Sequence, residues 1–389
     1  MQPLSFKIYS LVTALSFLPA LAVAGDGHDH DHGNASYSPH GAAGFYGHLD
    51  TKIHSDVVYK AEEKDEEISE TYSHTHLDLG YVFSTGLSLN SVIELEGEPA
   101  GHDHGGGGNA AEGNSRFFDD HTLKIRDLNI RYETDHFGLL AGKFSPVVGF
   151  DYHQFPGIYG YQIIHEYALR EKIGLGANLK LDAGDFGRHK LEASSFFADT
   201  SFLSGALLNR QDPVEKQDGG VSNTEDLSSF AVSLGGQDFY SLNNNIVQGL
   251  SYRIGFAHQA AGKNNEEDEN RYSVSLNYKH RFTKDFEGRM IGEIMHIQHL
   301  NGEAAHDRTW HTAGLEITYK NWNVGSTWSH IRNDNPVEID EAIDGDIVQA
   351  SIGYEFDSGV FLGVGYKYQD EENEENHRVG ALVSYSHHF

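Results

Sequence analysis

Two short tracts of the chain combine histidine with aspartate at close spacing. Gly25–Gly33 reads "GDGHDHDHG" and Gly101–Gly108 reads "GHDHGGGG". Imidazole and carboxylate groups together suit zinc, and also copper, nickel or ferrous iron. The chain has no Cys, so a bound metal would be held by His, Asp or Glu. The candidate ligands in the tracts are His28, His30, His32, His102 and His104.

The glycine content and low complexity of both tracts predict flexible segments rather than a preformed metal cage. Flexible ligands exchange metal quickly, which suits capture and hand-off better than catalysis. The plain alternative is that both tracts are only solvated, disordered ends and loops. We therefore expect no required cofactor, but transient binding of Zn²⁺ or another divalent cation.

Further histidines lie at alternate positions in two segments that we expect to be neighbouring strands. His48, His54 and Asp56 share one face of the first segment, and His74 and His76 share one face of the second. If the strands pair, the last four of these residues become neighbours near the outer mouth. Cross-strand neighbours lie about 5 Å apart, close enough to share one ion. A wall that is simply polar would account for the same residues.

These positions depend on strands, and the sequence alternates as strands do. Val360–Tyr368 reads "VFLGVGYKY", with the larger apolar residues on one face and Gly and Lys on the other. This period of two predicts a β-strand. The apolar face would be the core of a soluble sandwich, whereas it would face lipid in an outer-membrane barrel.

The connections between candidate strands favour the barrel. Short turns such as Thr85-Gly86 and Asp357–Gly359 alternate along the chain with long polar segments. Short periplasmic turns and long outer loops are typical of outer-membrane barrels, whose closure leaves no unpaired strand edge in lipid. We therefore expect an all-β, transmembrane antiparallel β-barrel of about 16 strands. The expected strands are 43–60, 71–84, 87–98, 121–134, 138–149, 165–183, 188–200, 228–240, 245–260, 271–283, 286–300, 309–321, 322–333, 344–356, 360–372 and 377–389.

The first residues predict export. Met1–Ala24 has a basic residue at Lys7, then an apolar stretch, then the small-x-small pattern that signal peptidase cleaves. We expect residues 1–24 to be a cleaved signal peptide. Residues 25–42 would then form a flexible His/Asp-rich tail, and residues 43–389 the barrel.

The last strand carries a resemblance to a known class. It reads "VGALVSYSHHF" and ends at Phe389, similar to the terminal aromatic signal that barrel-assembly machinery reads in outer-membrane proteins. With the strand count, the chain resembles a Gram-negative outer-membrane porin of the 16-stranded type over nearly its whole mature length. The resemblance implies residence in the bacterial outer membrane beside lipid and lipopolysaccharide, and association as a homotrimer. The His-rich tracts resemble those of zinc-regulated outer-membrane porins.

The third long segment, Phe150–Ile164, corresponds to the loop that folds inward in general porins. The resemblance gives it the role of a constriction, with Asp151, His153 and His165 as its polar candidates. An ordinary outward loop rich in aromatic residues is the alternative.

Basic residues on the flanking strands should point into the lumen. An Arg or Lys that faces lipid near the midplane costs roughly 2–4 kcal/mol. Opposite Asp151 and Glu166 these residues could create a transverse field, or they could line an anion path, since "EYALREKIGLG" is similar to phosphate-selective porins. Arg126 and Glu171 interrupt the alternation, which predicts a bulge or a subunit contact. The basic candidates are Arg126, Arg131, Lys143, Arg170 and Lys172.

The formal net charge of −30 argues against nucleic acid as a partner. Four expected outer segments carry −20 of it, namely Ala61–Glu70, Glu266–Asn270, Asp334–Asp346 and Asp370–Asn376. Their field would concentrate cations at the pore mouth within about 8 Å, the Debye length at physiological salt. The same charge would also serve solubility, or bind calcium and magnesium beside lipopolysaccharide.

The sequence thus predicts a passive channel for small solutes that assists divalent metal, with zinc preferred. Acidic loops would concentrate the ion and His/Asp groups would exchange it. A general or anion-selective (phosphate-like) porin and a siderophore porin, both with incidental histidines, are the alternatives. An adhesin is another. We expect no enzymatic activity, because no Ser/His/Asx set is placed for catalysis.

Overall fold

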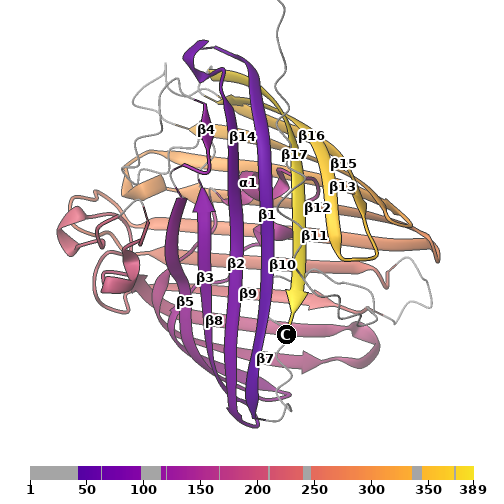
Figure 1. The fold of residues 1–389 in the computed structure, drawn as a ribbon. Helices are drawn as coiled ribbons and strands as arrows, with labels where there is room; N and C mark the ends of the chain where they lie inside the picture. Colours follow the sequence, from indigo (N-terminus) through magenta and orange to yellow (C-terminus); the bar gives the residue numbers. More distant parts are fainter. Residues whose placement is uncertain are drawn as a thin grey trace, which may run out of the picture.

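Antiparallel strands close into a single barrel in the described part of the chain (Figure 1). The computed structural model describes residues 43–62, 64–97, 115–119, 121–165, 167–208, 211–239, 247–334, 344–371 and 374–389. The expected signal peptide, the N-terminal tail and the second His/Asp tract lie outside these residues. Within the described ranges, no helix is long and apolar enough to cross a membrane.

Most of the strands that the structure describes are long, and together they form the wall of the barrel. They are β1 (Gly44–Ala61), β2 (Ser69–Ser84), β3 (Leu87–Gly97), β4 (Arg116–Phe117), β5 (His121–Glu133), β6 (Phe137–Phe144), β7 (Lys172–Asp182), β8 (Arg188–Ala198), β9 (Ser229–Gln237), β10 (Leu250–Gln259), β11 (Glu269–Thr283), β12 (Phe286–Gln298), β13 (Asp307–Tyr319), β14 (Trp322–Asp334), β15 (Gly345–Glu355), β16 (Val360–Glu371) and β17 (Glu374–His388). The helical turns are η1 (Lys64–Glu66), η2 (Tyr152–Gln154), α1 (Gly160–His165), η3 (Gly184–Phe186), η4 (Phe202–Ser204), η5 (Lys216–Asp218) and η6 (Leu300–Gly302).

The first and last strands pair and close the wall. β1 pairs antiparallel with both β2 and β17, so no edge remains between the two ends of the sheet. The two-residue β4 forms a parallel bridge to β2 and lies outside the antiparallel series. The other strands form the predicted closed 16-strand antiparallel barrel.

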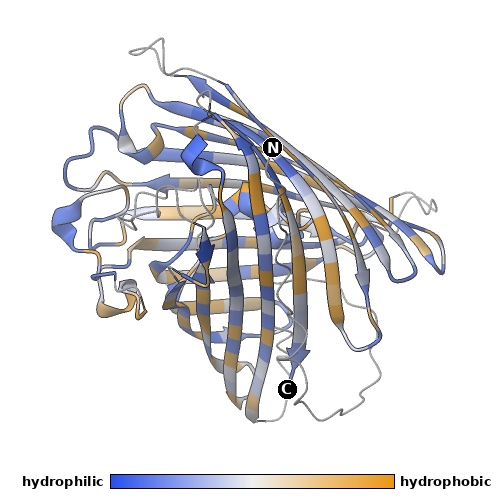
Figure 2. Ribbon diagram, turned by 45° about the horizontal axis from the view of Figure 1, so that its top comes forward, coloured by the Kyte–Doolittle hydropathy of each residue, from blue (hydrophilic) through white to orange (hydrophobic). Residues whose placement is uncertain are grey.

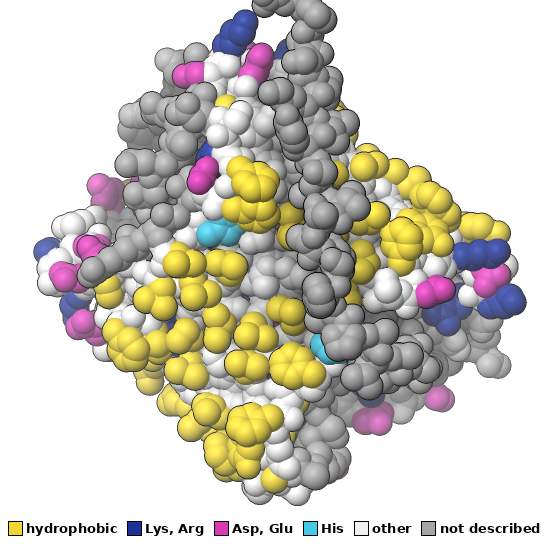
Figure 3. Space-filling model, in the orientation of Figure 1, with side chains coloured by type: hydrophobic (Ala, Val, Ile, Leu, Met, Phe, Trp, Pro, Cys, Tyr) yellow, Lys and Arg dark blue, Asp and Glu magenta, His cyan; other side chains and the backbone are white. Residues whose placement is uncertain are grey.

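The outer surface is apolar where the predicted lipid face lies. On β16, Leu362 and Val364 are 43% and 56% exposed, whereas Lys367 is 1% exposed and points inward. Colouring by hydropathy shows the same alternation along the front strands (Figure 2). Apolar side chains cover much of the lower part of the front face (Figure 3). This surface and the closed wall meet the requirements of a barrel that spans a bilayer, because each strand has its backbone partners within the sheet.

Two details of the wall bear on the site. The strand expected over 165–183 begins only at Lys172, so the prediction that Arg170 lies on a strand is wrong. The expected bulge at Arg126 is confirmed, since Val92 pairs with Asp127 while Ile93 pairs with Ile125. The bulge leaves Arg126 without a directly opposed partner, which lets both Arg126 and Asp127 lie on the inner side of the wall.

The segment between β6 and β7, residues 145–171, folds into the barrel as predicted, and we call it the inner loop. Its helix α1 lies inside the wall in Figure 1. The Pro156 carbonyl accepts a hydrogen bond from the Thr327 hydroxyl at 2.8 Å, and the Ile158 N–H donates to the Ser351 hydroxyl at 3.2 Å. On β16, a Cβ added at Gly365 would lie 2.9 Å from the Ile158 side chain. Glycine therefore makes room for the tip of the inner loop.

Apolar side chains on the inner face of the barrel receive the inner loop. They are buried at 3% exposure or less, and they belong to one cluster with buried loop residues such as Phe155 and Ile163. Sequence alternation places large apolar residues outward, so this inward patch was not predicted. Its side chains exchange water contact for packing against the loop, which favours the docked state by about 25 cal/mol per Å² of apolar surface removed from water. We call these residues the apolar wall: Ile291, Met295, Ile297, Trp310, Ile331 and Ile347.

Candidate functional site

Ionised and imidazole side chains line the inner face of β2, β3 and β5, and we call them the charged wall. Period-two alternation carries each of them inward, because each strand holds apolar residues such as Leu95 and Leu123 at the intervening positions. The inner loop approaches this wall with its η2 turn, whose Asp151 carboxylate accepts a hydrogen bond from the His153 N–H at 2.8 Å. The charged wall comprises His74, His76, Glu94, Glu96, Lys124 and Arg126.

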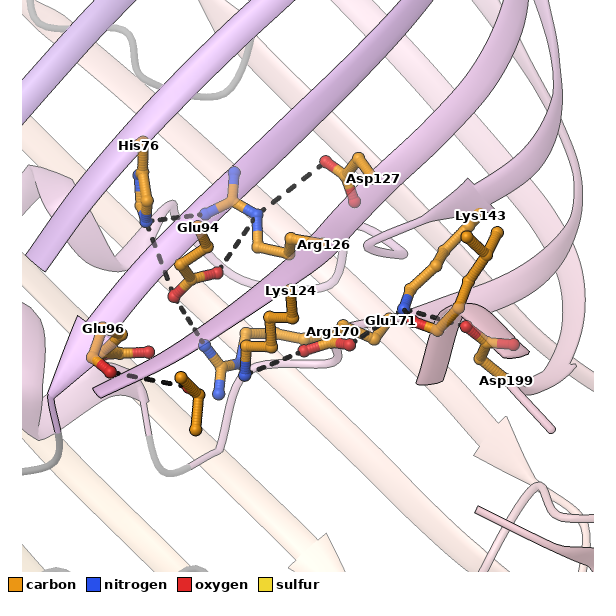
Figure 4. A network of polar contacts seen from close by, with 12 residues as sticks. His76, Glu94, Glu96, Lys124, Arg126, Asp127, Lys143, Arg170, Glu171 and Asp199 are labelled. Atoms are coloured by element: carbon orange, nitrogen blue, oxygen red, sulfur yellow. Dashed lines mark hydrogen bonds and ion pairs between the residues drawn. The ribbon is translucent and has the colours of Figure 1, made fainter. Parts of the chain in front are cut away.

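Glu94 lies at the centre of the contacts between the charged wall and the inner loop (Figure 4). Its carboxylate is fully buried and lies 4.0 Å from the Arg126 Nε and 4.0 Å from the Arg170 Nη1. Arg126 also donates to the Tyr152 hydroxyl at 2.9 Å. Burial raises the pKa of the Tyr152 phenol, which therefore stays neutral and can accept this hydrogen bond. Loop and wall are thus joined by charge at this point.

A second group of charges continues from the end of the inner loop (Figure 4). Glu171 lies 3.2 Å from the Lys124 ammonium and 3.0 Å from the Lys143 ammonium, and Lys143 also lies 2.8 Å from Asp199. Burial alone would raise the pKa of Glu171, but Lys124, Lys143 and Arg170 outweigh it and hold the pKa below its ordinary value. The glutamate is therefore ionised over the physiological range.

Three histidines meet where the η2 turn faces β2. The imidazole rings of His74 and His76 are 4.4 Å apart between centroids, and that of His153 lies 5.7 Å and 5.2 Å from them. One ring nitrogen from each lies within 4.8 Å of the others. His74, Glu94 and Glu96 form a second, overlapping group with the same spread of ligand atoms. Among the described residues, these are the groups with the residue types and spacing to hold a metal ion.

The predicted set of His54, Asp56, His74 and His76 does not form one cluster. His54 lies opposite Tyr72 and Asp56 opposite Glu70, while His74 lies opposite Lys52. The His54 ring stacks on Tyr72 with centroids 5.0 Å apart. The turn between the strands sets this register, and it places His54 two residues and Asp56 four residues beyond Lys52, the residue opposite His74.

Asp56 belongs to a buried ion network across the closing seam. Its carboxylate accepts hydrogen bonds from the Tyr159 hydroxyl at 2.9 Å and the Tyr72 hydroxyl at 3.0 Å. Arg378 of β17 donates to Glu70 at 2.7 Å and lies 3.5 Å from Asp56. Asp56 thus helps to hold the tip of the inner loop, and its predicted role as a metal ligand stays a prediction.

The remaining predicted site residues lie at separate places. His48 contacts Asp78 at 3.2 Å and Ser386 at 2.8 Å, near the C-terminal end of the chain. His165 ends α1, and its ring lies edge-on to Tyr152. Arg131 donates to Asn129 at 3.0 Å, and Lys172 donates to Ser222 at 3.0 Å.

The transverse arrangement expected between the basic residues and the pair Asp151 and Glu166 stays a prediction. Asp151 caps the η2 turn, and Glu166 lies outside the described residues. Among the described residues, basic groups face Glu94, Glu171 and Asp199. The tract histidines His28, His30, His32, His102 and His104 also lie outside the described residues, so their role stays a prediction.

Sequence reasoning missed Glu94 and Glu96 as members of the site. The signal was present, since "VIELEG" at 92–97 places both carboxylates on one face of a strand whose other face is apolar. Inward carboxylates beside two histidines of the adjacent strand would have indicated the group on the charged wall. The position of His153 beside these residues could not be predicted, because it depends on how the inner loop docks.

Comparison with solved structures shows which proteins share this fold. The outer-membrane channel DcaP of Acinetobacter baumannii superposes with a TM-score of 0.52 at 12% identity, covering 89% of this chain and 97% of that chain. OmpT, an outer-membrane protein of Vibrio cholerae, superposes with a TM-score of 0.51 at 12% identity, covering 90% of this chain and 99% of that chain. No protein-family model and no curated protein sequence matches the chain. The fold is that of outer-membrane β-barrels, which is consistent with the predicted location in the bacterial outer membrane.

Proposed function

We propose that the protein is a passive channel that lets small polar solutes cross the outer membrane. The observation that carries this proposal is the inner loop, which docks on the apolar wall and meets the charged wall through Arg126 and Tyr152. A loop held in this way narrows the lumen while leaving ionised groups on the wall. Charged side chains arranged around a narrow passage are a feature by which channels select their solutes.

The finer proposal is that divalent metal, with zinc preferred, is among the solutes. Imidazole groups on the charged wall and on the η2 turn support it, because neutral imidazole is a common ligand of zinc. The acidic outer segments would raise the cation concentration at the mouth. Zinc would then pass by exchange between weak sites, entering as cargo rather than as a resident cofactor.

Reconstitution tests both levels of the proposal. We expect liposomes that contain the protein to swell in small sugars, and planar bilayers to show ohmic single-channel currents. A zinc gradient should give a reversal potential of the sign expected for cation passage. Bilayers that conduct no current would contradict the channel proposal. Currents without zinc permeability would contradict only the proposal that zinc is among the solutes.

An anion-selective channel is a second candidate, and one observation favours it. The Arg126 Nε and the Arg170 Nη1 are buried and make no hydrogen bond in the described structure. A passing carboxylate or phosphate could accept hydrogen bonds from these donors. Reversal potentials in a potassium chloride gradient distinguish the candidates, because an anion path gives the opposite sign.

The predicted association partners and the absence of catalysis remain proposals. We propose a homotrimer in which the apolar outer face contacts both lipid and neighbouring barrels, and insertion through recognition of Phe389. Light scattering of the detergent-solubilised protein tests the trimer. Assays of lipid hydrolysis by the purified barrel test the expectation that it is not an enzyme.

A further inference from the structure

We infer that His74, His76 and His153 form one divalent-metal site that ties the inner loop to the barrel wall. The site itself rests on the geometry of these residues, and its influence on conduction rests on the proposed channel function. It differs from the exchange of cargo proposed above, because a metal held here bridges two separate parts of the fold. Bound metal would therefore act as a ligand that sets the constriction.

The imidazole nitrogens are already close to coordinating positions. One nitrogen from each ring lies within 4.8 Å of the others, whereas two nitrogens bound to one tetrahedral zinc lie roughly 3.4 Å apart, given Zn–N distances of about 2.0–2.1 Å. Small side-chain rotations close this difference. The Nε2 of His74 is buried, with the residue 2% exposed, and it makes no hydrogen bond in the described structure. A buried polar atom of this kind is costly unless a ligand satisfies it.

Carboxylates that contact the histidine rings support the assignment of a metal site. The Glu96 carboxylate lies 2.9 Å from the Nδ1 of His74 and so orients that ring with its Nε2 away from Glu96. A carboxylate that holds the far nitrogen of a ligating histidine is a usual feature of zinc sites. Glu94 lies 3.6 Å from the Nε2 of His76 and supplies negative charge beside the site.

Arg126 opposes metal binding at the same place. Its Nη1 lies 3.4 Å from the Nε2 of His76, so the guanidinium competes for the lone pair that a metal would use. Binding must displace this contact, and the cation also repels a divalent ion. The site is thus tuned toward moderate affinity, and removal of Arg126 should strengthen metal binding.

The consequence for the pore follows from where the ligands lie. His74 and His76 belong to β2, whereas His153 belongs to the η2 turn of the inner loop. Metal bound by all three would cross-link loop and wall. Its occupancy should therefore change the conductance for solutes that are not metals.

Cobalt titration of the purified barrel tests the site directly. The full-length mature barrel would carry a deletion of residues 26–32 and the substitutions His102→Asn and His104→Asn, so that the tracts do not contribute. We expect Co²⁺ to give visible absorption bands of a low-coordinate nitrogen site at one equivalent per chain. His74→Gln and His153→Gln should each weaken binding at least tenfold, and Arg126→Gln should strengthen it severalfold. His258→Gln is the matched control, because His258 contacts Asn270 on β11, away from the site, and should leave binding unchanged.

Different outcomes separate the inference from the proposed function. Absence of saturable Co²⁺ binding overturns the site, even if the barrel conducts. Binding that survives His153→Gln but is lost in Glu94→Gln assigns the metal to His74, Glu94 and Glu96, and so overturns the bridge between loop and wall. Binding without any conductance would remove the channel proposal while leaving the site intact.

Conduction tests the link to the constriction. Micromolar Zn²⁺ should change the single-channel current carried by potassium chloride, and His153→Gln should abolish that change. An equal zinc effect in both proteins contradicts the cross-link. Heat-modifiable migration on gels verifies that every variant is a folded barrel.

Discussion

The two sides of the lumen hold the same inner loop by different chemistry. The apolar wall, which includes Trp310 and Ile347, packs against loop side chains and excludes water. The charged wall, which includes Glu94 and Arg126, meets the loop through ion pairs and hydrogen bonds. Apolar packing is non-directional and fixes the position of the loop, whereas ionised groups remain able to exchange partners with a solute. Under the proposed channel function, the apolar wall would position the constriction and the charged wall would set its selectivity.

The largest expected effect comes from breaking the apolar wall. Trp310 is 2% exposed and packs on Tyr167 of the inner loop, with ring centroids 5.2 Å apart. Trp310→Ala should lower the free energy of unfolding by about 3–5 kcal/mol, because it leaves a cavity beneath the loop. Single-channel conductance should rise as the loop loosens. Denaturant titration in detergent and bilayer recordings measure the two effects.

Trp328 supplies the control, since it lies on β14 and faces outward at 43% exposure. Trp328→Ala removes the same side chain from the lipid side, so the conductance should not change. Equal gains in conductance for both tryptophan variants would contradict the positioning role of the apolar wall.

A smaller effect is expected where glycine makes room for the loop. Gly365→Val places a Cβ 2.9 Å from Ile158 and should cost about 1–3 kcal/mol by overpacking. The loop tip should move, and the current should become noisier or larger. Gly44→Val is the comparison, because a Cβ added at Gly44 meets nothing within 4 Å. Unaltered currents in Gly365→Val would show that the tip does not limit conduction.

On the charged wall, substitution should alter selectivity more than the position of the loop. Arg126→Ala removes the cation beside Glu94 and His76 and should raise the cation-to-anion permeability ratio by roughly twofold or more through the local field. Reversal potentials in a salt gradient measure the ratio. A large rise in conductance without a selectivity change would instead make Arg126 a positioning residue like Trp310.

The smallest effect concerns pH and Glu171. Because its pKa is held below the ordinary value, Glu171 stabilises the fold above the pKa of the unfolded chain, and this contribution is lost as pH falls through the folded pKa. Glu171→Gln should therefore be less stable than the wild type at neutral pH, and the two should converge in acid. Melting curves across pH check this, and a constant difference down to strong acid would contradict it.

The barrel was predictable because the strands alternate outward apolar residues with inward small or polar ones. Outward Leu362 and Val364 and inward Lys367 followed from alternation, and the bulge at Arg126 followed from a break in it. Inward Trp310 did not follow, because an apolar residue on the lumen side makes sense only once the loop that covers it is known.

The site was only partly predictable for a related reason. His74 and His76 lie on one strand, so their common face could be read from spacing. Their neighbours could not, because the turn before β2 sets the register and places Tyr72, not His74, opposite His54. His153 reaches His74 from a different segment of the chain, through loop docking that local patterns do not encode.

The ion network at the closing seam bears on the order of assembly. Arg378 arrives with the last strand, whereas its partners Glu70 and Asp56 belong to the first two, and Tyr159 of the inner loop binds the same Asp56. Until β17 docks, Asp56 lacks the Arg378 guanidinium, and Glu70 has only its ion pair with Arg116 of β4. Such long-range pairing is a late event in folding, since a loop of this length must first be ordered. The ion network that holds the tip of the inner loop is therefore complete only when the barrel closes. A barrel that still lacks β17 would have an incomplete constriction.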